Sequence, residues 1–211
     1  NPVDVDVTVL FNTSNGTATA GDNDYTGVVN QTVTFPANTT TAQTVNVAIG
    51  ADNKVEDNET YTVGIGTLSA SGRNVSLGTS SRTGTINNDD NATITITPAG
   101  GVSQNEGNSS TTTFTFTVTL NNPVQGGFSV GFSTMDGTAN SPSDYSGVSA
   151  SLTFMGNANE SGNIGIFVNG DLDIENDETF TFQLGTVTAA TTVQTNAISV
   201  GSPKTGTILN D

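Results

Sequence analysis

The chain contains an internal repeat that spans most of its length. Residues 1–18, NPVDVDVTVLFNTSNGTA, align without a gap on residues 122–139, NPVQGGFSVGFSTMDGTA, at an offset of 121 positions. The correspondence runs on through NDYTGV and SDYSGV and ends with TGTINND and TGTILND, while the offset drifts only between 119 and 122. Two similar halves of this length predict two domains with the same fold.

Apolar residues alternate with polar residues at matching places in the two halves. This period of two is typical of β-strands with one buried face, and Gly, Asn and Asp separate the runs as turn residues do. The alternating positions are Val7, Val9 and Phe11, Val45, Val47 and Ile49, and Tyr61, Val63 and Ile65 in the first half, and Phe114, Phe116, Val118 and Leu120, Ile164, Ile166 and Val168, and Phe180, Phe182 and Leu184 in the second. Short strands at this spacing predict an all-β fold of two tandem antiparallel sandwiches.

The two copies are unequal in length. Residues 91–121 precede the aligned start of the second copy, whereas nothing precedes the first. We therefore expect a domain at 1–90 that lacks its first strands and a second domain at 91–211. A sandwich without its first strands should have an open side, which another segment of a longer parent chain, or another chain, would fill.

The composition excludes several classes of function. The chain has no Cys, His or Trp, which removes thiol and imidazole metal ligands, disulfides and every catalytic site that needs His. Four basic residues against 20 acidic residues give a net charge of −16. Such a chain should repel nucleic acid and anionic membranes, and no apolar run is long enough for membrane insertion. Divalent cations are the partners that the charge favours, although an acidic solvated surface explains the same composition.

Both halves carry the same cluster of acids. Asp52, Glu56 and Glu59 in the first half correspond to Asp171, Glu175 and Glu178 in the second. Carboxylates this close repel one another unless a cation or protons relieve the charge. A hard cation that takes 6–8 oxygen ligands would do so, and the absence of His and Cys favours calcium over a transition metal. A solvated acidic rim is the alternative. Further carboxylates are available at Asp24, Asp144, Asp89, Asp90 and Asp211.

These motifs resemble those of the Calx-beta domain. The resemblance rests on GTA followed by DY, on D-x-x-x-E-x-x-E-T-[YF], and on TGTI with terminal acids. It implies immunoglobulin-like β-sandwiches that bind Ca²⁺ at one end. The ligands that it implies are Asp24, Asp52, Glu56, Glu59, Asp89 and Asp90 in the first copy, and Glu106, Asp144, Asp171, Glu175, Glu178 and Asp211 in the second. Asp173 is an additional acid, which either joins the ligands or faces water.

The function that we expect is a calcium-binding structural or adhesive segment of a longer extracellular protein, secreted or on a bacterial cell surface. Calcium would stiffen the domain ends and the joint, and the partners would be calcium ions, neighbouring repeats and a surface receptor. Two alternatives are a regulatory calcium-sensor tandem and a subunit of an extracellular filament, completed by a strand from a neighbouring chain. Paired carboxylates also serve glycosidases, but without Trp or an aromatic cleft we expect no enzyme.

Overall fold

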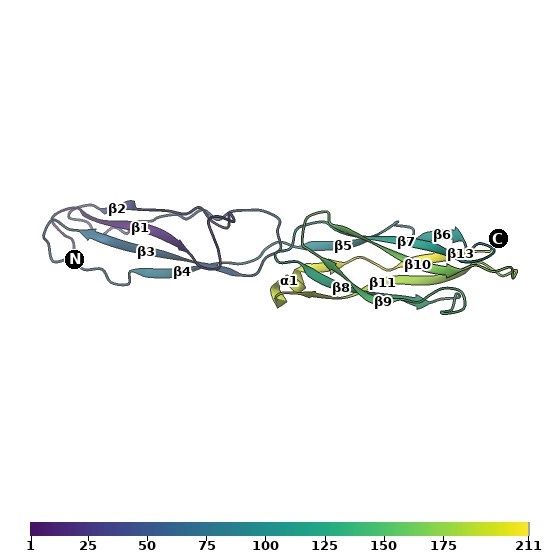
Figure 1. Cartoon of the computed structure of the whole chain (residues 1–211). Coiled ribbons are helices and arrows are strands. Elements are labelled where there is room, and N and C mark those ends of the chain that lie inside the picture. Colours follow the sequence, from purple (N-terminus) through teal and green to yellow (C-terminus); the bar gives the residue numbers. More distant parts are fainter. Residues whose placement is uncertain (211) are drawn as a thin grey trace. The chain divides into compact units, whose positions relative to one another are not determined.

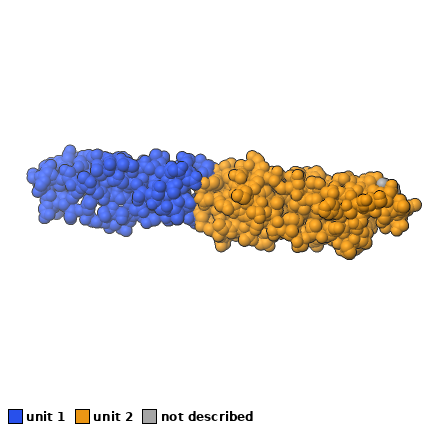
Figure 2. Space-filling model, viewed as in Figure 1, with its two compact units in different colours: residues 1–52, 58–88 blue, residues 53–57, 89–211 orange. Residues whose placement is uncertain are grey.

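The computed structural model describes residues 1–210 and divides into two compact units. Unit 1 comprises residues 1–52 and 58–88, and unit 2 comprises residues 53–57 together with those from 89 onward (Figure 2). These units differ from the domains predicted from the repeat at residues 53–57 and 89–90. The regular structure is almost all β-strand, which confirms the predicted fold class (Figure 1). Within residues 1–210, no helix has the length and apolar character needed to cross a bilayer.

Unit 1 is built on a single antiparallel sheet. Its four strands lie in the order β2-β1-β3-β4. Their bounds are β1 Val7–Asn15, β2 Gln31–Phe35, β3 Glu59–Ser69 and β4 Ser81–Ile86. The alternation predicted for β1 is observed, because Val7, Val9 and Phe11 are buried on one face of the sheet. That face is the core side of the unit.

The strand predicted at Val45, Val47 and Ile49 does not form. Within unit 1 as described, residues 44–50 make only an isolated bridge between Ile49 and Tyr25, and Ile49 is 47% exposed. The reason is visible in unit 2, where the corresponding strand β10 (Ser161–Asn169) lies at a sheet edge and pairs with β7 (Thr111–Leu120) alone. Unit 1 has no counterpart of β7, so its alternating segment has no strand to pair with.

Unit 2 is a sandwich of two sheets, with strand orders β10-β7-β5-β12 and β6-β13-β11-β8-β9. Its other elements are β5 Ala92–Thr97, β6 Val102–Asn105, β8 Phe128–Asp136, β9 Ser149–Phe154, β11 Glu178–Ala189, α1 Thr192–Ala197, β12 Ile198–Val200 and β13 Lys204–Leu209. Most strand pairs are antiparallel, as predicted. Two are parallel, β12 with β5 and β6 with β13, and these were not expected from the sequence.

Aromatic side chains from both sheets form the centre of the unit 2 core. The rings of Phe116 on β7 and Phe182 on β11 stack at a centroid distance of 4.7 Å, and both side chains are fully buried. Tyr145 stacks in the same way on Phe180, at 4.6 Å. Aromatic pairs of this kind add to the free energy gained by burying their area. The core thus joins the two sheets close to the loop that carries Asp144.

The repeated TGTI motif places a glycine against an aromatic ring in each unit. Gly206 on β13 pairs with Phe180 on β11, and a Cβ atom at Gly206 would overlap the Phe180 ring. Gly84 on β4 pairs in the same way with Tyr61 on β3, and a Cβ there would overlap the Tyr61 ring. Glycine is required because the aromatic ring of the neighbouring strand occupies the space that a Cβ atom would fill. The ring packs in the part of the unit next to its acidic end.

Candidate metal centre

In unit 2, Asp144 is held in place by a short, well-bonded loop between β8 and β9. Its Oδ2 atom accepts a hydrogen bond from the Asn140 backbone N–H at 2.7 Å, and its carbonyl accepts one from the Asn169 N–H at 2.9 Å. The next residue, Tyr145, is buried and donates its hydroxyl to Asp136 Oδ1 at 2.6 Å. The position of the Asp144 carboxylate is therefore set by the folding of the core.

Glu178 is the first residue of β11, and its carboxyl group faces those of other predicted ligands. Burial raises the pKa of Glu178 to about 7, with further contributions from a hydrogen bond to Asp144 and from the charges of Asp144, Glu175 and Glu106. Glu106, just after β6, is itself 5% exposed. Four predicted ligands of the second copy thus act on one another electrostatically at one end of unit 2.

Asp144 is the ionised partner of Glu178. Burial opposes its ionisation, but hydrogen bonds from the Asn140 N–H and from the Ser143 and Glu178 side chains outweigh burial and lower the pKa of Asp144. A carboxyl beside a carboxylate holds a proton because two adjacent negative charges repel each other. A bound cation would replace that proton and allow both groups to ionise.

The remaining predicted ligands of unit 2 lie on the exposed loop between β10 and β11. Asp171, Asp173 and Glu175 all face solvent, and Asp171 Oδ1 accepts a hydrogen bond from the Asp173 N–H at 2.7 Å. The Asp173 carbonyl accepts a second hydrogen bond, from the Asn210 amide at 3.2 Å. Asp211 lies outside the described residues. The structure therefore brings Glu106, Asp144 and Glu178 together, and the exposed Glu175 acts on Glu178 through its charge, whereas Asp171 and Asp173 lie at the rim.

In unit 1, Asp24 has the same local support as Asp144. Its Oδ2 atom accepts a hydrogen bond from the Thr19 N–H at 2.6 Å, and its carbonyl accepts one from the Gly50 N–H at 3.0 Å. Asp24 is 8% exposed, and its Oδ1 atom is buried without a hydrogen-bond partner. Glu59, the first residue of β3, is equally buried, whereas Asp52 is exposed. A buried carboxylate oxygen without a partner is destabilising unless a proton or a cation satisfies it.

The other predicted ligands of the first copy, Glu56, Asp89 and Asp90, are counted with unit 2. Glu56 is partly buried, and its Oε1 atom lies 2.5 Å from the Lys54 ammonium group. Asp89 is exposed and Asp90 is partly buried. Lys54 occupies the position that Asp173 has in the second copy, so the two acidic loops differ in charge at this point.

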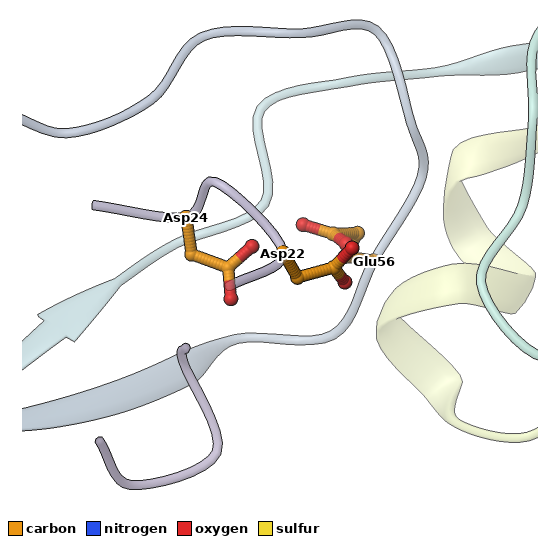
Figure 3. Close-up of side chains that lie close together, drawn as sticks. All are labelled: Asp22, Asp24 and Glu56. Atoms are coloured by element: carbon orange, nitrogen blue, oxygen red, sulfur yellow. The ribbon is translucent and has the colours of Figure 1, made fainter. Parts of the chain in front are cut away.

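Two acids near these loops were not predicted. Asp22 projects from the same loop of unit 1 as Asp24, and Figure 3 labels both of them together with Glu56. Asp177 accepts a hydrogen bond from the Asn210 N–H at 3.3 Å in unit 2. The loop of Asp22 is one residue longer than its counterpart in the second copy, so no repeated motif marks it. Proximity of Asp22 to Asp24 in sequence was the available signal.

The donor set fits a hard cation. All the gathered side chains are carboxylates, which suit Ca²⁺. Two features of the structure support the fit independently of sequence: the buried Asp24 Oδ1 atom without a partner, and the Asp144–Glu178 pair, in which burial and the neighbouring carboxylates raise the pKa of Glu178. Residues that could hold the ion are Asp22 and Asp24 in unit 1, where Glu59 is buried at the position that Glu178 has in the second copy, and Glu106, Asp144, Glu175 and Glu178 in unit 2.

Comparison with known proteins gave matches among solved structures and among protein families, and none among the curated proteins. The crystal structure of the apo form of the Calx CBD1 domain is 22% identical, covers 58% of this chain and 99% of that chain, and has a TM-score of 0.48. The crystal structure of CBD12 from CALX1.2 is 18% identical, covers 99% of this chain and 89% of that chain, and has a TM-score of 0.42.

The family comparison covers the whole described chain. The Calx-beta domain matches residues 1–100 and, a second time, residues 89–210. This double match confirms the resemblance seen in the repeated motifs, and with it calcium as the cofactor of the family. The chain belongs to the Calx-beta domain family.

Proposed function

We propose that each unit binds calcium through its inward-facing carboxylates and that the chain serves as a calcium-stiffened structural or adhesive segment of an extracellular protein. The observation that carries the proposal is the grouping of the Glu178 carboxyl with its hydrogen-bond partner Asp144 and with Glu106, which is only 5% exposed. Burial first, and then the hydrogen bond to Asp144 and the charges of Asp144, Glu175 and Glu106, raise the pKa of Glu178 to about 7. A cation of charge two removes that conflict more completely than a proton does.

The proposed stiffening of the domain end follows from the positions of the candidate calcium ligands along the chain. In unit 2 they belong to four places in the chain: the end of β6, the β8–β9 loop, the β10–β11 loop and the start of β11. An ion bound by such separate segments would hold the loops at that end together. The absence of Cys means that no disulfide can do so, which supports a metal as the constraint.

Calcium titration of the whole chain tests the proposal. We expect Ca²⁺ to bind and to raise the melting temperature, since an ion that binds only the native state stabilises it by about 2.7 kcal/mol at 100 times its Kd. Glu178→Gln should weaken binding in unit 2 alone, and Glu59→Gln in unit 1 alone. Asp6→Asn is the matched control, because Asp6 is exposed and its Oδ1 atom only accepts a hydrogen bond from Ala37. Equal melting temperatures in chelator and in millimolar calcium would overturn the proposal.

A second candidate role, acceptance of a strand from another chain, is favoured by a cavity in unit 1. The cavity has a volume of about 430 Å³, and its lining includes Val7 and Val9 of β1, Ile65 and Leu68 of β3, and Val75. In unit 2, β5 and β7 cover the corresponding face of the sheet. A peptide of residues 91–121 added to the whole chain should bind and slow amide exchange in residues 44–50. Unchanged exchange at saturating peptide would exclude this role.

A further inference from the structure

The acidic segment 53–57, which comes from the first repeat, docks on the start of the second repeat within unit 2. The Val55 N–H donates to the Pro123 carbonyl and the Gln125 N–H donates to the Val55 carbonyl, each at 2.9 Å. These two bonds form a parallel bridge between Val55 and Val124, and both side chains are buried in the unit 2 core. Val55 is therefore an apolar residue at the centre of an acidic loop, and it packs against the Asn-Pro-Val segment at residues 122–124.

The repeat contains a second acidic loop with an aliphatic residue at its centre and a second Asn-Pro-Val segment, but these two do not contact each other. Ile174 corresponds to Val55 in the second acidic loop and is 94% exposed. The Asn-Pro-Val sequence of residues 122–124 recurs at residues 1–3, followed by Asp4 in the place of Gln125. There, Pro2, Val3 and Asp4 line an open groove of unit 1 with Arg73 and Val75.

We propose that Ile174 docks on the Asn1–Asp4 segment of a second copy of this chain, in the way that Val55 docks on residues 123–125 inside unit 2. The Ile174 N–H would donate to the Pro2 carbonyl, and the Asp4 N–H would donate to the Ile174 carbonyl. The two surfaces differ from each other and lie on different units, so the contact is heterologous and links copies head to tail. A single apolar side chain and two main-chain bonds make a small interface, so the association is weak and depends on concentration.

Charge makes this docking dependent on a cation. In unit 2, Val55 is flanked by Lys54, which pairs with Glu56, and Glu56 also accepts a hydrogen bond from Gln125 at 3.5 Å. At the second position Asp173 replaces Lys54 and Asp4 replaces Gln125, so two carboxylates would face each other, although Asp4 is also paired with Arg73 in the groove. Like charges brought this close repel each other, and calcium on the loop offsets the repulsion. This dependence on calcium rests on the proposed function, whereas the docking geometry does not.

Sedimentation of the whole chain over a range of concentrations, at about 0.15 M salt, tests the docking. We expect association with calcium and none with chelator. Ile174→Asp should weaken the association at least about tenfold, because it places a charge where an apolar side chain is buried. Leu172→Asn is the matched control: Leu172 is 79% exposed, its counterpart is Asn53, and the change should leave association intact.

The variant D173K separates the docking from its control by calcium, since it restores a basic residue at the position of Lys54 and leaves the Asp4–Arg73 ion pair in place. It should associate in chelator as well as in calcium. If titration shows that calcium binds the wild type but only the variant associates, the docking is supported and its control by calcium is overturned. If neither protein associates, the docking itself is overturned, whether or not calcium binds.

Thiol cross-linking identifies the surfaces, because the chain has no Cys of its own. A chain with Val3→Cys mixed with a chain with Ile174→Cys should form the mixed disulfide several-fold faster than either forms a disulfide with itself. Val29→Cys in place of Val3→Cys is the control for random collision, since Val29 is 78% exposed elsewhere on unit 1. Equal rates with Val3→Cys and Val29→Cys would refute the assignment.

Discussion

Each unit contains a sheet with the same succession of repeated strands, but among the described residues only unit 2 has a second sheet that covers it. The order β2-β1-β3-β4 in unit 1 corresponds strand by strand to β9-β8-β11-β13 in unit 2. In unit 2 the sheet β10-β7-β5-β12 lies over it, and Phe182 and Val168 are fully buried. Their counterparts in unit 1 are Val63, which is half-buried, and Ile49, which is 47% exposed.

The difference distinguishes structural features that form from residues close together in sequence from features that need a distant segment as a partner. Hairpin pairing and the loop that holds the aspartate are local, and both units have them: the N–H of Thr19 supports Asp24 as that of Asn140 supports Asp144. Burial of the sheet and the formation of its edge strand need residues far away in sequence. A unit can therefore retain its candidate metal ligands while lacking much of its core.

The largest expected effect comes from removing a core side chain that only unit 2 possesses. Phe116→Ala should destabilise unit 2 by about 3–5 kcal/mol, because it leaves a cavity between Phe180 and Phe182. Amide exchange read by mass spectrometry, peptide by peptide, should show faster opening throughout residues 91–210 and no change in β1 and β3. Comparable loss of protection in β1 and β3 would mean that the two units fold as one.

Replacement of the glycine of the TGTI motif should sharpen the contrast in packing. Gly206→Ala should destabilise unit 2 by about 1–3 kcal/mol, since the Cβ meets the fully buried Phe180 ring, which cannot move aside. Gly84→Ala should have a smaller effect in unit 1, where the half-buried Tyr61 ring can shift. Urea denaturation of both variants measures the difference. Equal losses would show that the ring of Tyr61 is held as firmly as that of Phe180.

The pH dependence of unit 2 without calcium should reveal the Glu178–Asp144 pair. Burial and the neighbouring carboxylates raise the pKa of Glu178 from its ordinary value of 4.5 to about 7 in the folded state, so the folded state holds this proton more tightly. The associated stability is fully present below pH 4.5 and is lost as the pH rises through 7. The loss should be on the order of 1–2 kcal/mol, because partial exposure to solvent reduces the effect.

Glu178→Gln provides the check on this titration. In chelator at pH 8 the variant should be more stable than the wild type, and its stability should change little between pH 5 and 8. In saturating calcium the order should reverse, because the variant has lost a ligand. A wild-type unit 2 whose melting temperature in chelator does not vary over this range would contradict the assignment of the shared proton.

The smallest expected effect lies at the surface of unit 1. Arg73 makes a bidentate contact with Asp4 at 2.7 and 2.8 Å, but both side chains are exposed. Exposed ion pairs contribute little and are screened by salt. Arg73→Gln should therefore leave the melting temperature of the chain within experimental error. A clear decrease would show that this pair, rather than packing, compensates unit 1 for its missing sheet.

Much of the fold could be predicted from the sequence because the repeat and the period of two report on local structure. The alternating runs at Val7, Phe114 and Phe180 are all observed as strands. The prediction at residues 44–50 was wrong because alternation shows which face a strand would bury, but not whether a partner strand exists. The parallel pairing of β6 with β13 was not foreseen for a related reason, since it joins residues about one hundred positions apart.

The candidate site was predictable where the repeat marked it. Glu106, Asp144 and Glu175 all act on Glu178 in unit 2. Asp144, Glu175 and Glu178 were identified from repeated motifs, whereas Glu106 has no repeated counterpart and was identified from the resemblance to the Calx-beta domain. Asp22 and Asp177 were missed because Asp and Asn are frequent in turns, so a single acid without a repeated counterpart carries little information. The choice between a loop acid that faces inward and one at the rim, such as Asp171, depends on loop geometry that spacing alone does not define.

The tyrosine that follows each inward-facing aspartate gives the chain an intrinsic fluorescence signal close to the candidate metal sites. Tyr25 follows Asp24 and Tyr145 follows Asp144, and they are two of the three tyrosines in a chain without Trp. Each hydroxyl donates to a side-chain oxygen, that of Tyr25 to Asn15 and that of Tyr145 to Asp136. Only Tyr145 has a carboxylate acceptor, which quenches phenol emission. Ultraviolet excitation therefore gives a label-free fluorescence signal in which the environments of the two aspartates contribute differently.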